Sequence, residues 1–72
     1  MKSQPLTARQ SEVLNFITDF IGKNGFSPTS REIADHFSVC QTRGAAYILA
    51  LELKGYISHQ PGKMRTIKIL KP

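Results

Sequence analysis

The 72-residue sequence has one cysteine, no tryptophan and no apolar run near the roughly 20 residues that span a bilayer. Cys40 has no partner for an intramolecular disulfide and cannot form a cysteine-based zinc site alone, although a bridge between two chains stays open. The first ten residues contain no apolar core for a secretory signal. We therefore expect a cytoplasmic protein without a membrane segment.

Catalytic signatures are also missing. His36 and His59 are isolated from any cluster of cysteine, histidine and carboxylate residues, and no glycine-rich phosphate loop occurs. Ser38 and Cys40 lie near His36 in the sequence, but closeness within a turn does not make a catalytic triad. We expect no enzymatic activity, no metal, no cofactor and no small-molecule ligand.

Acidic residues are scarce in the second half of the chain. Ten lysine and arginine residues stand against five acidic residues, which gives a formal net charge of +5. Residues 1–36 contain four basic and four acidic residues, so the whole excess lies in residues 37–72. A basic half favours an anionic partner such as nucleic acid, although a lysine-rich tail that only aids solubility would carry the same charge.

Two capping boxes mark the starts of helices. Thr7 precedes Gln10, and Thr29 precedes Glu32, at the spacing at which two side chains satisfy backbone N–H groups of a first helical turn. An apolar stripe with helical periodicity follows each box. The sequence predicts helices over residues 8–23 and 30–36.

A third helix is predicted over residues 43–54, with Thr42 as its cap and Lys54-Gly55 at its end. Gly44 weakens this helix by about 1 kcal/mol relative to alanine. Two helices joined by a short turn, with the second on the basic side, form a helix-turn-helix.

The last part of the chain has the pattern of a hairpin. Strand-like residues flank Pro61-Gly62, which is a strong turn signal. We expect a two-stranded antiparallel wing over residues 56–70, anchored to the helices by Ile67, Ile69 and Leu70. The predicted fold is mainly α with a small β-hairpin: a winged helix-turn-helix of three helices and a wing, forming a single domain over residues 1–72.

Three segments resemble the N-terminal DNA-binding domain of LexA-type repressors: LTARQSEVLNFI, SPTSREIADHF and ALELKGYI, followed by a basic hairpin. The family has a Leu-Thr-x-Arg-Gln opening, a Pro-Thr-x-x-Glu-Ile-Ala second helix and a Lys-Gly-x-Ile exit from the third helix. The resemblance covers roughly residues 5–70. It implies a winged helix-turn-helix that binds double-stranded DNA sequence-specifically and regulates transcription, with repression as the expected effect.

LexA-type repressors also carry a C-terminal dimerisation and self-cleavage domain with a Ser/Lys pair, whereas this sequence ends at Pro72. We therefore expect no self-cleavage. The chain is either a fragment of a longer protein or a stand-alone regulator from a bacterium, phage or mobile element.

The resemblance places the base-reading positions near the start of the third helix, at Cys40, Thr42, Arg43, Ala45 and Ala46. The family typically has an asparagine at the position of Thr42 and two glutamates at Ala45 and Ala46, so we expect a different DNA sequence to be read. Arg43 is suited either to bidentate pairing with guanine or to a phosphate contact. The two alanines can contact thymine methyl groups.

A second set of residues is expected to contact the DNA backbone. Thr29 and Ser30 stand at the start of the second helix, where unpaired N–H groups and the helix dipole attract phosphate. Lys63 and Arg65 near the hairpin tip, and Lys68 further along, form a wing that follows the backbone or enters the minor groove. A solvated tip is the alternative for the wing. The set also includes Gln41, Lys54 and Tyr47, whose ring either lies at the groove edge or fills the core.

Leu49 and Leu53 are apolar at positions that are usually basic in the family. Their spacing puts them on the side of the helix that carries Ala45, which indicates a surface for a second copy of the chain on DNA or for a partner protein. A rotated helix, or a wing that covers them, would remove that surface. The alternative function is therefore a winged-helix module that binds another regulator through the apolar face of its third helix.

Overall fold

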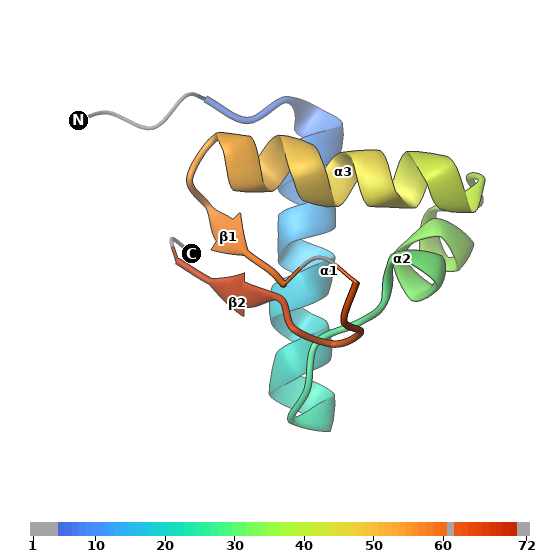
Figure 1. Cartoon of the computed structure of the whole chain (residues 1–72). Coiled ribbons are helices and arrows are strands. Elements are labelled where there is room, and N and C mark those ends of the chain that lie inside the picture. The colour runs from blue at the N-terminus through green and yellow to red at the C-terminus, as the bar shows by residue number, and fades with distance from the viewer. Residues whose placement is uncertain (1–4, 61, 71–72) are drawn as a thin grey trace.

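The computed structural model describes residues 5–60 and 62–70, which contain three helices and two short strands. The elements in chain order are α1 (Ala8–Asn24), α2 (Ser30–Phe37), α3 (Gln41–Leu53), β1 (Ile57–Ser58) and β2 (Lys68–Ile69). Figure 1 shows α3 crossing α1, with α2 beside the N-terminal end of α3 and the strands near its other end. The predicted class, a mainly α winged helix-turn-helix, is confirmed.

Both predicted capping boxes are confirmed. Thr7 Oγ1 accepts a hydrogen bond from the backbone N–H of Gln10 at 3.1 Å, and Thr7 N–H donates to Gln10 Oε1 at 3.2 Å. Thr29 and Glu32 exchange the equivalent bonds at 3.1 and 2.9 Å. Because each cap satisfies orphan N–H groups next to the apolar stripe, α1 and α2 begin at the predicted residues.

The start of α3 differs from the prediction. This helix begins at Gln41, two residues earlier, and its N-cap is Cys40, whose side chain makes no capping hydrogen bond. The predicted Thr42 cap is therefore wrong. Ser38 adopts a left-handed conformation, with φ 58°, directly after α2, so the chain reverses at once and the next helix starts sooner. All three helices end within one residue of the predicted ends.

The hydrophobic core lies where the three helices and the wing meet. Its buried members come from every described element except β2: Val13, Leu14, Ile17, Ile33, Ile48, Leu51, Ile57 and Ile67. Among the described residues, no helix has the length and apolarity that a membrane span requires.

The wing is mostly irregular, in contrast to the longer strands that the sequence predicts. Only two residues of each strand pair, with Ile57 opposite Ile69. Arg65 has a left-handed conformation, with φ 57°, and the Thr66 hydroxyl accepts a hydrogen bond from Gln60 N–H at 2.9 Å, so a side chain replaces the backbone ladder there. Pro61, half of the predicted turn, lies outside the described residues.

The apolar anchors of the wing are only partly as predicted. Ile67 is buried and Ile69 packs against the core, but Leu70 is 57% exposed. Leu70 N–H donates to the carbonyl of Tyr56 at 2.8 Å, so its backbone closes the hairpin while its side chain faces outward. The prediction of Leu70 as an anchor is therefore wrong.

Candidate nucleic-acid interface

The crossing of α2 and α3 positions the interface, and it depends on Gly44. A Cβ atom at Gly44 would lie 2.5 Å from the carbonyl oxygen of Ser30 and 3.0 Å from Ala34 Cβ. No real Cβ comes that close to a backbone oxygen, so only glycine lets the two helices approach this far. Sequence reasoning counted Gly44 only as a weak point of the helix and missed this contact, although a glycine inside a helical pattern often has such a packing reason.

The buried face of α3 fixes which residues point outward. Gly44, Ile48 and Leu51 are buried, whereas Ala45, Ala46 and Leu49 between them are exposed and face away from the core. The predicted base-reading residues are all exposed: Cys40, Thr42, Arg43, Ala45 and Ala46. Within residues 5–60 and 62–70, the Arg43 side chain has no hydrogen bond or ion pair, so its five donors are available to a ligand.

The start of α2 offers backbone donors beside a carboxylate. The N–H groups of Ser30 and Arg31 make no hydrogen bond to any described residue, as expected for a first helical turn. Thr29 N–H, in contrast, is taken by Glu32 Oε1 at 2.9 Å. The Arg65 guanidinium and the Thr29 backbone hold the pKa of Glu32 below its ordinary value of 4.5, so this carboxylate is ionised at neutral pH.

The basic residues of the wing divide into two kinds. Lys63 and Lys68 are exposed, and their ammonium groups have no partner among the described residues. Arg65 is held instead: its Nη1 and Nη2 donate to the two carboxylate oxygens of Glu32 at 3.0 and 3.1 Å. Of the three predicted wing contacts to phosphate, only the two lysines are therefore free.

Two further members of the predicted backbone set also have internal contacts. Lys54 Nζ donates to the carbonyl of Pro5 at 3.0 Å and to Gln10 Oε1 at 2.6 Å, which ties the end of α3 to the start of α1. Tyr47 is partly buried against the core, and its ring meets Phe37 edge-on with centroids 6.2 Å apart. Gln41 is exposed in the first turn of α3.

A groove of about 710 Å³ lies between α3, the start of α2 and the wing. It brings together residues from all three predicted sets, including Thr29, Ser30, Ala45, Lys63 and Leu49. Figure 1 shows the described chain between β1 and β2 bending back toward the link before α2. Residues of both segments line the groove. The groove therefore joins part of each predicted set, whereas four predicted base-reading residues lie outside its lining: Cys40, Thr42, Arg43 and Ala46.

Leu49 and Leu53, paired in the sequence interpretation, have different surroundings. Leu49 is 54% exposed and lines the groove beside the wing. Leu53 is 83% exposed and lies outside the groove lining. The wing thus borders one leucine and leaves the other in solvent.

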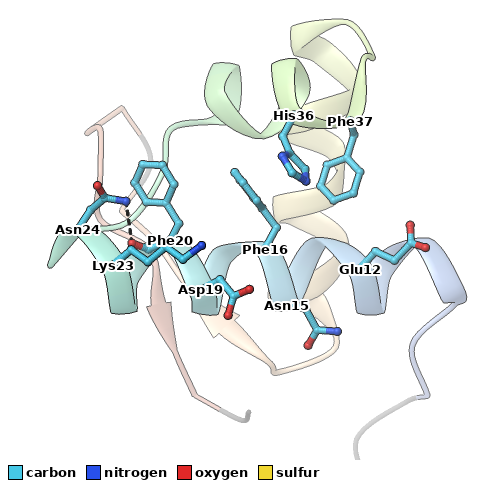
Figure 2. Close-up of a pocket in the computed structure, with 9 residues that line it drawn as sticks. All are labelled: Glu12, Asn15, Phe16, Asp19, Phe20, Lys23, Asn24, His36 and Phe37. Atoms are coloured by element: carbon cyan, nitrogen blue, oxygen red, sulfur yellow. Dashed lines mark hydrogen bonds between the residues drawn. The ribbon is translucent and has the colours of Figure 1, made fainter.

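A second hollow of about 550 Å³ lies between α1 and α2 and shares no residue with the groove. Figure 2 shows Phe16 of α1 pointing toward His36 and Phe37 of α2, while the Phe20 ring lies further along α1. The rings of Phe16 and His36 stack with centroids 4.1 Å apart. No predicted site residue lines this hollow, because its aromatic residues resemble ordinary core positions in the sequence.

Comparison with known proteins supports the resemblance stated above. The LexA DNA binding domain family matches residues 3–66. The LexA repressors of Thermosipho africanus and Thermotoga maritima are each 47% identical over 66 residues, which is 92% of this chain and 33% and 34% of those proteins. LexA repressor 1 of Geobacter sulfurreducens is 44% identical over 68 residues, which is 93% of this chain and 34% of that protein.

The chain thus spans about a third of the length of these curated relatives. The family match covers most of the sequence and includes both capping boxes, the whole of α3 and the part of the wing that contacts α2. The chain belongs to the LexA DNA-binding domain family.

Proposed function

We propose that this protein binds double-stranded DNA sequence-specifically and represses transcription in the cytoplasm. The observation that carries the proposal is the groove that brings exposed Ala45 of α3, the start of α2 and exposed Lys63 of the wing together. Arg43 is exposed in the first turn of α3, and its side chain has no partner among the described residues. The family of the chain, and relatives named as LexA repressors, support the same function.

In this proposal α3 enters the major groove with its N-terminal end. Arg43 pairs with guanine O6 and N7, because a guanidinium offers two parallel donors at the right spacing. Thr42 contacts a base or a phosphate beside Cys40, and Ala45 and Ala46 lie against thymine methyl groups. The short alanine side chains let the backbone of the helix approach the bases closely.

The backbone of the DNA is held from two sides. The N–H groups at the start of α2, with the Ser30 hydroxyl, bind one phosphate at the positive end of the helix dipole. Lys63 and Lys68 bind phosphates from the wing. Because each neutralised phosphate releases counterions, affinity falls steeply with salt, and Lys63→Ala reduces the slope of log K against log salt by about 0.9.

Selection of bound sequences from a random duplex library tests the proposal, since it yields the operator and its half-site spacing. On the selected duplex, Arg43→Ala is expected to cost about 1–3 kcal/mol and to relax the preference at one base pair. Lys23→Ala removes the same charge from an exposed position of α1 and serves as the matched control. Failure to enrich any sequence, or retention on duplex DNA that is insensitive to salt, would contradict the proposal.

A second candidate function is a protein-interaction module, which the exposure of Leu49 and Leu53 favours. In this alternative the leucines bind a second copy of the chain on DNA or another regulator. Sedimentation of the wild type and of a Leu49→Lys, Leu53→Lys variant at high concentration tests the homodimer. If the wild type and the variant both sediment as monomers, self-association through this face is excluded.

A further inference from the structure

The Arg65 side chain makes several contacts within the protein. Two of its donors meet the two carboxylate oxygens of Glu32, and Nη1 also donates to the carbonyl of Ser27 at 3.1 Å. The guanidinium carbon lies 4.6 Å from the centre of the Phe26 ring. These partners lie 33 to 39 residues away in sequence. Phe26 and Ser27 belong to the segment that leads into α2, and Glu32 belongs to the first turn of α2. Arg65 therefore joins the wing to the start of α2.

A buried hydrogen bond strengthens the same connection. Ser27 is only 3% exposed, and its hydroxyl accepts from the backbone N–H of Ile67 at 3.1 Å. Arg65 itself adopts a left-handed conformation that non-glycine residues rarely take. This local strain is offset because the conformation lets the guanidinium reach Glu32 while Ile67 enters the core.

We propose that Arg65 is a positioning residue that holds the wing against the start of α2 and does not itself bind phosphate. We call the contact of Arg65 with Glu32 and Ser27 the clamp. The clamp presents Lys63 and Met64, both exposed at the wing tip, to a ligand lying along α3. The part of the proposal that concerns DNA rests on the proposed function, whereas the clamp itself is a property of the free protein.

Electrostatics supports this assignment. Glu32 lies beside the free N–H groups at the start of α2, where an unpaired carboxylate would repel the phosphate that those groups attract. Arg65 neutralises that carboxylate through a planar, bidentate contact. A lysine ammonium cannot reproduce two parallel bonds together with a stacked ring, so the site requires arginine rather than any positive charge.

The first test is hydrogen exchange in the free protein, read at the Ile67 amide, with the amide of buried Ile17 as the reference for global folding. Arg65→Lys keeps the positive charge but removes the guanidinium and its bidentate contact with Glu32. If Arg65 is the clamp, exchange at Ile67 accelerates about tenfold or more while exchange at Ile17 stays unchanged. Unchanged protection at Ile67 would overturn the proposal, whether or not the protein binds DNA.

The second test is the affinity of the variants for a fluorescein-labelled duplex carrying the selected sequence. A clamp predicts that Arg65→Lys weakens binding about five- to tenfold, comparable to the loss of one hydrogen bond. A phosphate contact predicts near-normal binding by Arg65→Lys, because lysine also binds phosphate. Near-normal affinity together with intact exchange protection would overturn the proposal.

The Glu32→Gln variant distinguishes a clamp from a phosphate-binding arginine, because the two roles of Arg65 predict opposite changes in DNA affinity relative to a control variant. Glutamine preserves the capping box with Thr29 but weakens the bidentate contact. A clamp predicts weaker DNA binding than in Asp35→Asn, which removes the same charge from an exposed position of the same helix. A released phosphate-binding arginine would instead bind DNA more tightly than that control, which would overturn the proposal. Failure of the wild type to bind any duplex would refute the proposed function, and the exchange measurement would still test the clamp.

Discussion

Replacing Gly44 by alanine is expected to destabilise the domain, although alanine is the better helix former. In an open helix position this substitution would add about 1 kcal/mol of stability. At Gly44, however, the new Cβ would lie 2.5 Å from the Ser30 carbonyl oxygen and 3.0 Å from Ala34 Cβ. A backbone carbonyl inside α2 cannot rotate away as a flexible side chain can, so the helices themselves must separate.

The expected size follows from these two opposing effects. Overpacking of this kind costs about 1–3 kcal/mol, and a backbone contact of 2.5 Å puts Gly44→Ala toward the upper value. After the gain in helix propensity, the net loss in the free energy of unfolding is about 2 kcal/mol. For a domain of this size the melting temperature falls by about 8–16 °C.

Thermal and urea unfolding followed by circular dichroism measure this loss. Gly22→Ala is the matched control, because Gly22 is an exposed position of α1 and nothing lies within 4 Å of a Cβ there. That control is expected to gain about 1 kcal/mol. If Gly44→Ala proved as stable as the wild type, the close crossing of α2 and α3 would not be what requires glycine.

Two further predictions concern the contact between the wing and α2. Because Arg65 lowers the pKa of Glu32 in the folded protein, the ionised carboxylate stabilises the fold above its unfolded pKa of about 4.5, and this stabilisation is lost as the pH falls through the lowered value. Urea unfolding between pH 7 and pH 3 should therefore depend less on pH in Glu32→Gln than in the wild type. Ser27→Ala leaves the buried N–H of Ile67 without its acceptor and is expected to cost about 1–3 kcal/mol in urea unfolding. Ser11→Ala, whose hydroxyl has no hydrogen bond to the described residues, should stay within about 0.5 kcal/mol of the wild type, and equal losses in both variants would contradict the role of Ser27.

The third helix shows where a pattern within the sequence can mislead. Thr42 is a good capping residue by type, but α3 begins before it at Gln41. The left-handed Ser38 shortens the turn, and serine adopts that conformation too rarely for sequence alone to predict it. The predicted base-reading residues are nevertheless exposed, as expected, because the apolar spacing of Ile48 and Leu51 sets which side of α3 is buried.

The sequence by itself determined the order and type of the elements of this protein and the starts of its first two helices. Capping boxes and helical periodicity act over three or four residues, so the starts of α1 and α2 could be predicted from Thr7 and Thr29. The family motifs are likewise contiguous, and the excess of positive charge in residues 37–72 is a matter of composition.

Tertiary structure alone decided which of the predicted site residues are free to act. Arg65 and Lys63 are two residues apart and both basic, yet Arg65 meets a carboxylate from α2 while Lys63 stays in solvent. Gly44, which in the sequence is only a weak point of a helix, is required for the close crossing of α3 with α2, because a Cβ there would meet the backbone of α2. Each outcome depends on a partner at least ten residues away, and only the folded chain brings those partners within hydrogen-bonding or van der Waals distance.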